Sequence, residues 1–184
     1  MNLCNESELR ELLARHGFHF SKSKGQNFLV RDWVPQRIAE AAGVDDAFVL
    51  EVGPGVGTLT VQLCRRAAAV CSVEVDRSLT PLLAETLGAF SNVEVLFDDI
   101  LNTDIPAVVA ARAGGRRAVA CANRPYYITT DVLTRLLSCG CFADVTVMIQ
   151  KEVAQRICAR AGTAAYGAFS VFCRYWADAE LCFD

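Results

Sequence analysis

Short apolar blocks alternate with polar blocks along the chain, and their spacing predicts strands and helices in turn. Apolar runs of strand length, bounded by polar or glycine-containing segments, predict strands over 48–52, 69–75, 93–97, 118–122 and 145–149. Helical spacing separates these runs, and two further helices are predicted near the start of the chain, over 6–15 and 32–42. This alternation favours one doubly wound α/β domain with a mostly parallel sheet.

The first predicted strand leads into a glycine-rich loop. Gly53, Gly55 and Gly57 lie between that strand and a helical stretch over 58–63. Glycine suits such a loop because the backbone turns sharply and lets a ligand approach where a Cβ would collide. The next apolar run, over 69–73, leads to Glu74, which lies twenty-one positions after Gly53, a distance typical of a carboxylate that binds a ribose diol. The alternative is that the three glycines only form a turn between a strand and a helix, and the presence of Glu74 weighs against it.

The spacing of the glycines distinguishes between nucleotide cofactors. A dinucleotide loop has the form G-x-G-x-x-G, whereas this loop is G-x-G-x-G with Pro54 inside it. It resembles the first motif of S-adenosylmethionine-dependent methyltransferases. A nicotinamide oxidoreductase is therefore disfavoured.

Polar residues recur where predicted strands end. Glu74, Asp98 with Asp99, and Asn123 all follow apolar runs, and the carboxyl ends of parallel strands share one edge of a sheet. Each of them alone would also be explained as a cap of a loop or helix. Asn123 opens the segment Asn-Arg-Pro-Tyr, in which the Asn123 side chain and the Pro125 carbonyl offer acceptors and Tyr126 offers a ring face. These groups suit an exocyclic amine on a nucleobase.

Composition narrows the class of protein. Of the 184 residues, 53% are hydrophobic, and the mean hydropathy is +0.27. No apolar run reaches the roughly 18 residues of a membrane span, and the first ten residues contain acids where a secretory signal has its apolar core. We therefore expect a cytoplasmic, monomeric protein without a membrane span.

The nine cysteines are scattered through apolar segments and form no C-x-x-C motif. Small core residues are the natural interpretation of five of them, Cys64, Cys71, Cys121, Cys158 and Cys173. Cys139 and Cys141 form the one close pair, and no histidine lies near them in the sequence. No metal site is expected.

The net charge of −3 argues against indiscriminate binding of nucleic acid. Basic residues do concentrate near the start of the chain. Lys22, Lys24 and Arg31 are the candidate phosphate contacts there, against the alternative of a solvated basic face.

Six segments, in order along the chain, resemble the KsgA family of ribosomal RNA adenine dimethyltransferases. Their specificity lies in the ordered set, which covers residues 25 to 171. The segments are Gly25-Gln-Asn-Phe-Leu29, Glu51-Val-Gly-Pro-Gly55, Val73-Glu-Val-Asp-Arg77, Asn123 with Pro125-Tyr126, Gln150-Lys-Glu-Val153 and Tyr166-Gly-Ala-Phe-Ser-Val171.

The resemblance implies a function and a set of roles. The fold would be Rossmann-like, the cofactor S-adenosylmethionine, and the substrate two adjacent adenines near the 3′ end of small-subunit ribosomal RNA, in an immature subunit during ribosome biogenesis. Asp99 would hold the adenine amine of the cofactor, with Asp98 beside it as the alternative. The resemblance assigns closure over the cofactor to Gln26, Asn27 and Leu29. It assigns contact with the methionine end of the cofactor to Gly53 and Gly55, and contact with its ribose to Glu74. The target adenine would be held by Asn123, Pro125 and Tyr126.

The chain departs from the family in two respects. Arg124 stands where the family usually has Leu or Ile. Three interpretations of this residue are open: it points to solvent, it contacts an RNA phosphate, or it damages the site. Residues 177–184 alternate in strand fashion and stop in mid-pattern, so we expect residues 1–184 to be a catalytic domain without the family's C-terminal helical domain.

Two other functions stay open at this point. One is a related erythromycin-resistance methylase that acts on large-subunit RNA. The other is a ribosome-assembly factor whose catalysis is dispensable.

Overall fold

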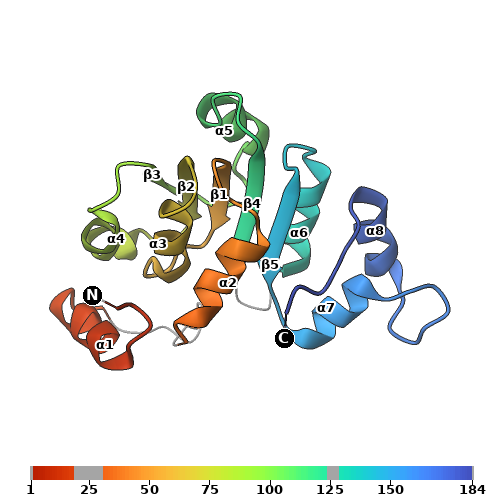
Figure 1. Ribbon diagram of the computed structural model, residues 1–184, viewed down its shortest axis with the longest axis horizontal. Coiled ribbons are helices and arrows are strands. Elements are labelled where there is room, and N and C mark those ends of the chain that lie inside the picture. Colours follow the sequence, from red (N-terminus) through yellow and green to blue (C-terminus); the bar gives the residue numbers. More distant parts are fainter. Residues whose placement is uncertain (1, 19–30, 124–128, 184) are drawn as a thin grey trace.

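The computed structural model describes residues 2–18, 31–123 and 129–183, which form a sheet with helices on both of its faces (Figure 1). The strands are β1 (Phe48–Val52), β2 (Ala69–Glu74), β3 (Val93–Phe97), β4 (Ala118–Asn123) and β5 (Asp144–Met148). The helices are α1 (Glu6–Arg15), α2 (Trp33–Ala41), α3 (Thr58–Cys64), α4 (Thr80–Leu87), α5 (Ile105–Arg112), α6 (Thr129–Ser138), α7 (Lys151–Cys158) and α8 (Ala168–Trp176), with a short 3-10 helix at Arg77–Leu79.

The five strands run parallel in the order β3-β2-β1-β4-β5. The chain therefore builds outward from β1 in one direction and returns to place β4 on its other side. This arrangement puts the reversal of strand order between β1 and β4, the position at which open α/β sheets bind their ligands. The predicted doubly wound parallel sheet is confirmed.

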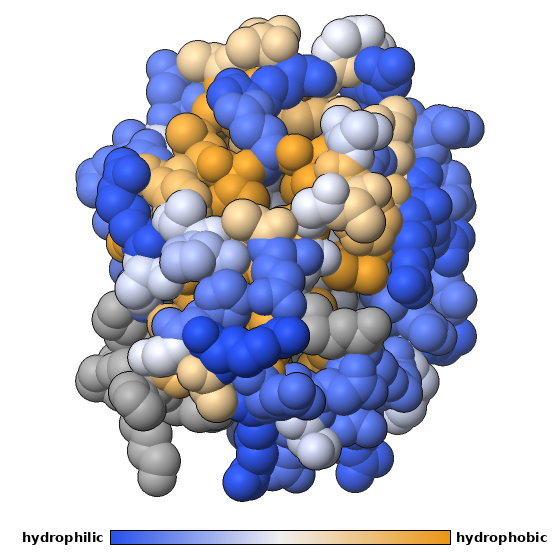
Figure 2. Space-filling model, turned by 90° about the vertical axis from the view of Figure 1, so that its left-hand side faces the viewer, coloured by the Kyte–Doolittle hydropathy of each residue, from blue (hydrophilic) through white to orange (hydrophobic). Residues whose placement is uncertain are grey.

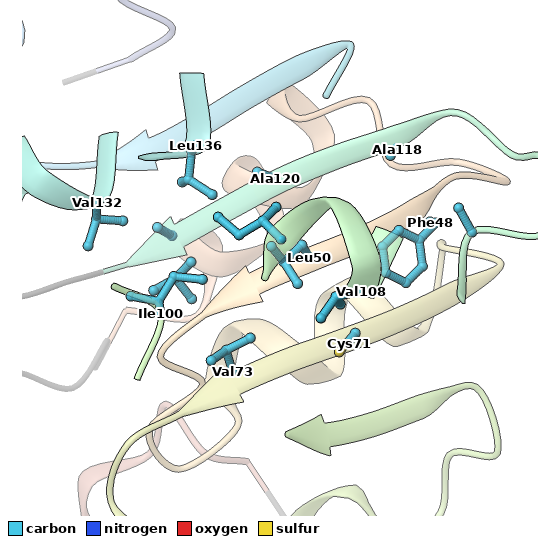
Figure 3. Packing of buried hydrophobic residues seen from close by; sticks show 14 residues of the cluster. Phe48, Leu50, Cys71, Val73, Ile100, Val108, Ala118, Ala120, Val132 and Leu136 are labelled. Carbon is cyan, nitrogen blue, oxygen red and sulfur yellow. The ribbon is translucent and has the colours of Figure 1, made fainter. Parts of the chain in front are cut away.

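Alternate residues of each central strand face opposite helical layers. Val49 of β1 packs in a cluster with residues of α2 and α3, while Leu50 packs with residues of α5 and α6. Figure 3 shows the second cluster, in which Ile100, Val132 and Leu136 gather over β1 and β4. Because all five residues of β1 are buried, its sequence is almost continuously apolar.

The boundaries of three strands and the start of one helix differ from prediction by one residue. β2 ends at Glu74, one residue early, because Val75 is 58% exposed and lies outside the sheet. β4 runs one residue further than predicted and takes in Asn123, while β5 begins and ends one residue early. The predicted start of α2 at residue 32 is likewise one residue too early.

The strand-like alternation near the end of the chain is the clearest error. Residues 177–183 form neither strand nor helix. Phe183 instead packs against the cluster beneath α2 and α3, with its ring 6.0 Å from that of Trp33. Packing of a partly buried aromatic ring, and not strand pairing, therefore holds this segment against the domain.

The cysteine interpretation holds for four of the five residues. Cys64, Cys71, Cys121 and Cys173 are buried among apolar side chains, whereas Cys158 is only half-buried. Burial raises the pKa of Cys64 to about 12, with the nearby Glu51 carboxylate as a second cause.

One edge of the sheet lies at β3, and the other at β5. The residues of β3 are half-buried apart from the exposed Glu94, which forms an ion pair with Arg112 of α5. Figure 2 views the molecule from this side and shows apolar residues gathered in the upper half of the face. Among the described helices, none has the length and apolar character needed to cross a membrane.

Candidate functional site

The glycine loop between β1 and α3 is held by backbone geometry that only glycine adopts readily. Gly53, Gly55 and Gly57 have φ values of 71°, 58° and 91°. A Cβ on Gly57 would lie 3.0 Å from the Thr86 hydroxyl and 3.2 Å from a methyl group of Leu87. The third glycine thus allows α3 to pack closely on α4, and the first two shape the turn itself.

Glu74 contacts this loop directly. Its carboxylate accepts hydrogen bonds from the backbone N–H groups of Gly55, at 3.3 Å, and of Asp76, at 2.9 Å. The side chain is 4% exposed. The glycine loop and the acidic residue twenty-one positions later, which were linked only by spacing in the sequence, are therefore neighbours at the end of the sheet.

Strand register aligns the other polar residues with this pair. Val52, the last residue of β1, pairs with Val73 of β2 and Ala122 of β4, so Gly53, Glu74 and Asn123 each lie one residue beyond the same level. Glu74 in turn pairs with Phe97, and Asp98 follows it. The four carboxyl ends therefore bring their polar residues to one edge, as predicted.

Asp98 and Asp99 occupy different environments. Asp98 is exposed, and its carboxylate accepts hydrogen bonds from the Thr103 hydroxyl and from the backbone N–H of Asp99. The half-buried Asp99 organises the following turn, because its carboxylate accepts from the backbone N–H of Leu101, at 2.9 Å, and from the Asn102 side chain. Both carboxylates keep lone pairs for a ligand, so the geometry leaves Asp98 and Asp99 as alternatives.

Several predicted site residues lie outside the described residues. These are the candidate phosphate contacts Lys22 and Lys24, the first-motif residues Gln26, Asn27 and Leu29, and Arg124, Pro125 and Tyr126 after β4. Arg31 is described and exposed, just before α2. Asn123 is half-buried at the end of β4.

Two features of the site were missed by sequence reasoning. Glu51 is 1% exposed within β1, and its carboxylate accepts hydrogen bonds from the hydroxyls of Thr60, at 2.7 Å, and Ser72, at 2.6 Å. A carboxylate inside the apolar run Phe-Val-Leu-Glu-Val was the available signal. Glu51 thus ties β1 to β2 and α3 directly beneath the glycine loop.

The second missed feature is the hydroxyl of Thr58, the first residue of α3. It is buried, and it has no hydrogen-bond partner in the described part of the chain. Buried hydroxyls are usually paired, so an orphaned one beside a glycine loop fits a site that a polar ligand completes. Nothing in the sequence marked Thr58 apart from its place after Gly57.

The arrangement offers binding groups for a nucleoside with a polar tail. A buried carboxylate at the end of β2 suits a ribose diol, a carboxylate after β3 suits an amino group on a purine, and the glycine turn permits close approach of the backbone. Among the described residues, no group of three His, Cys, Asp or Glu side chains is placed to hold a metal ion.

Comparison with known proteins identifies relatives over nearly the whole chain. The family model for ribosomal RNA adenine dimethylase matches residues 17–183. The chain is 42% identical over 185 residues to the ribosomal RNA small subunit methyltransferase A of Geobacillus thermodenitrificans, covering 98% of this chain and 62% of the relative. The corresponding protein of Ligilactobacillus salivarius is 44% identical, with the same coverage. The chain thus spans about three-fifths of the length of these relatives.

Solved structures place the fold. The 23S rRNA methyltransferase ErmE is 34% identical with a TM-score of 0.63, over 71% of this chain and 50% of that one. A dimethyladenosine transferase from Plasmodium falciparum is 27% identical with a TM-score of 0.66, over 77% of this chain and 50% of that one. The fold is therefore the Rossmann-like fold of S-adenosylmethionine-dependent methyltransferases.

The resemblance drawn from six ordered motifs is confirmed by these matches, which extend over nearly the whole chain. Together with the glycine loop, Glu74 and Asn123 at one edge of a parallel sheet, they establish that the chain belongs to the ribosomal RNA adenine dimethylase family.

Proposed function

We propose that this chain is the catalytic portion of an S-adenosylmethionine-dependent enzyme that dimethylates N6 of two adjacent adenines near the 3′ end of small-subunit ribosomal RNA. It would act in the cytoplasm on an immature small subunit. The observation that carries the proposal is the alignment of Gly53, Glu74 and Asn123 beyond the ends of three neighbouring strands. The curated relatives, which bear the name of a small-subunit methyltransferase, support the choice of substrate.

The residues present fit the cofactor. Glu74, buried and held by two backbone N–H groups, would accept hydrogen bonds from the ribose hydroxyls. Asp99, or Asp98 beside it, would accept from the purine amino group. The orphaned Thr58 hydroxyl after the glycine loop provides a further donor at the same edge. S-adenosylmethionine, when bound, supplies an electrophilic methyl group.

The target adenine poses a problem of positioning more than of acid–base chemistry. The lone pair of its exocyclic nitrogen is delocalised into the ring, so the protein must hold the N–H bonds in a geometry that directs this lone pair toward the methyl group. The side-chain oxygen of Asn123 would accept one N–H bond. Pro125 and Tyr126, outside the described residues, would supply a carbonyl acceptor and a stacking ring.

A flipped, unstacked adenine is the form of substrate that such a site admits. Arg31, exposed before α2, would contact RNA phosphate together with Lys22 and Lys24, which lie outside the described residues. Each such contact contributes about one unit to the dependence of log affinity on log salt concentration.

A methylation assay separates this proposal from its nearest alternative. The chain is incubated with labelled S-adenosylmethionine and either immature small subunits or large subunits that lack the methylation. Label on adenines of the small subunit alone supports the proposal. Label on the large subunit would favour the resistance methylases, to which the 34% identity with ErmE gives weight.

A further inference from the structure

The segment that follows β3 carries the two candidate carboxylates for the cofactor and is fixed at both of its ends. At its start, the backbone N–H of Asp98 donates to the Glu74 carbonyl at 3.0 Å, which joins it to β2. At its end, the side chain of Asp104 accepts from the backbone N–H of Ala107 and so caps α5. Residues 98–104 therefore form a short bridge between the cofactor edge of the sheet and α5.

The internal shape of this bridge is set by Asp99 and Thr103. The backbone N–H of Thr103 donates to the Asp99 carbonyl at 2.9 Å. The hydroxyl of Thr103 lies 3.0 Å from the Asp98 carboxylate and 2.9 Å from the same carbonyl. Thr103 is only 2% exposed. A displacement of Thr103 would consequently move both carboxylates.

One contact from α6 holds Thr103 from outside the bridge. The guanidinium of Arg135 donates a hydrogen bond to the Thr103 carbonyl, across thirty-two positions of sequence. Apolar packing accompanies it, because Ile100 of the bridge lies in the same cluster as Val132 and Leu136, which flank Arg135 on α6 (Figure 3). Hence α6, which follows the Asn123–Tyr126 segment, supports the carboxylate bridge on this side.

The placement of Arg135 lowers the stability of the fold, so a role other than packing is expected for it. Its Nε is buried, and it has no hydrogen-bond partner in the part of the chain that the structure describes. An unpaired buried donor is destabilising, and packing alone would be served by an apolar residue of similar length. The contact that Arg135 does make is to the residue that positions Asp98 and Asp99.

We propose that Arg135 is a positioning residue for the cofactor site, which sets the place of the Asp98 and Asp99 carboxylates through the Thr103 carbonyl. This role rests on the proposed function, because it concerns the purine end of the same cofactor. It also links the two halves of the site, since one helix both follows the target-base segment and supports the cofactor carboxylates.

The test uses binding calorimetry on the 184-residue chain with S-adenosylhomocysteine and with 5′-methylthioadenosine, which keeps the nucleoside but lacks the amino-acid end. Arg135→Met should raise Kd for both ligands by the same factor, about threefold to tenfold, the scale of one lost hydrogen bond. Arg135→Lys should restore most of the affinity, because one donor suffices for one carbonyl. Arg116→Met is the control: it removes the same positive charge from an exposed residue at the opposite end of the sheet. It should leave both Kd values unchanged.

Thr103→Val supplies a second arm that keeps the shape of the side chain and the carbonyl. It should raise both Kd values, and the double variant with Arg135→Met should lose less affinity than the product of the two single losses, because both act through one bridge. This arm also tests the role if Arg135→Met does not fold.

The outcomes separate the two proposals. Unchanged Kd values for Arg135→Met or Thr103→Val, whatever the change in melting temperature, would overturn the positioning role while leaving the proposed function intact. A loss with no rescue by lysine would overturn it too, since packing alone would then explain the effect. Failure of the unsubstituted chain to bind either nucleoside would overturn the proposed function and this role together.

Discussion

Glu74 shows how a single residue connects the fold to the site. As the last residue of β2 it belongs to the sheet, and through Gly55 it also contacts the glycine loop. Two backbone N–H groups orient its carboxylate before any ligand arrives. Orientation in advance lowers the entropy that ligand binding must overcome.

This preorganisation leads to a prediction for the isosteric change Glu74→Gln. It should weaken binding of S-adenosylhomocysteine by about 1 to 3 kcal/mol, because the amide keeps the size of the side chain but loses one acceptor for the ribose hydroxyls. Isothermal titration calorimetry measures the change. Glu11→Gln, an exposed change on α1, serves as the control. If the two variants bind equally well, Glu74 has no ribose role.

Asn123 differs from Glu74 in the step that it serves. Asn123→Ala should lower the rate of methyl transfer to small subunits by about 10²-fold or more, the scale seen when one preorganised group that stabilises a transition state is removed. Kd for S-adenosylhomocysteine should change far less. The slower methyl transfer and the nearly unchanged Kd both follow from a side chain that contacts the target amine. Single-turnover methylation measures the first, and calorimetry the second. Intact turnover with lost cofactor binding would instead assign Asn123 to the cofactor alone.

Residues of the candidate site were named from the sequence, while their contacts were not accessible from it. Spacing joined Gly53 to Glu74, and the ends of apolar runs marked Asp98, Asp99 and Asn123. The bond from Arg135 to Thr103 had no sequence signal, because it depends on how α6 packs beside α5. Long-range contacts of this kind follow from tertiary packing rather than from local pattern.

At the scale of elements, α6 stabilises the sheet by packing on it. Its buried face includes Leu136, 1% exposed, which packs with residues of β1, β4 and α5. Leu136→Ala should lower the free energy of unfolding by about 2 to 5 kcal/mol, the usual cost of truncating a fully buried leucine.

Urea denaturation followed by circular dichroism measures this loss. The control is Leu181→Ala, since Leu181 is 54% exposed and its truncation should change the free energy of unfolding by no more than about 0.5 kcal/mol. Equal losses for the two variants would show that α6 does not stabilise the sheet in solution.

The positions of the strands were predicted well, and their ends less well. β1 and β3 match their predicted ranges because turns bound their apolar runs on both sides. The strand-like alternation over residues 177–183 does not form a strand, because alternation alone does not provide a partner strand. An aromatic ring that can be buried under α2 and α3 then decides where the segment lies.

At the scale of the whole molecule, the sheet order places the site. With β4 beside β1, the glycine loop and Asn123 meet at the reversal of strand order, where an open α/β sheet binds its ligand. The chain covers 62% of the length of its curated relatives and yet contains all of these strand ends. We therefore expect cofactor recognition to be complete within the 184 residues.

Calorimetric titration of the unsubstituted chain tests this expectation most directly. S-adenosylhomocysteine, S-adenosylmethionine and NAD are titrated in parallel under the same conditions. We predict that both sulfur-containing nucleosides bind with one-to-one stoichiometry and that NAD does not, because the loop is G-x-G-x-G and Glu74 is placed for a single ribose. Binding of NAD without binding of either sulfur-containing nucleoside would contradict the central claim.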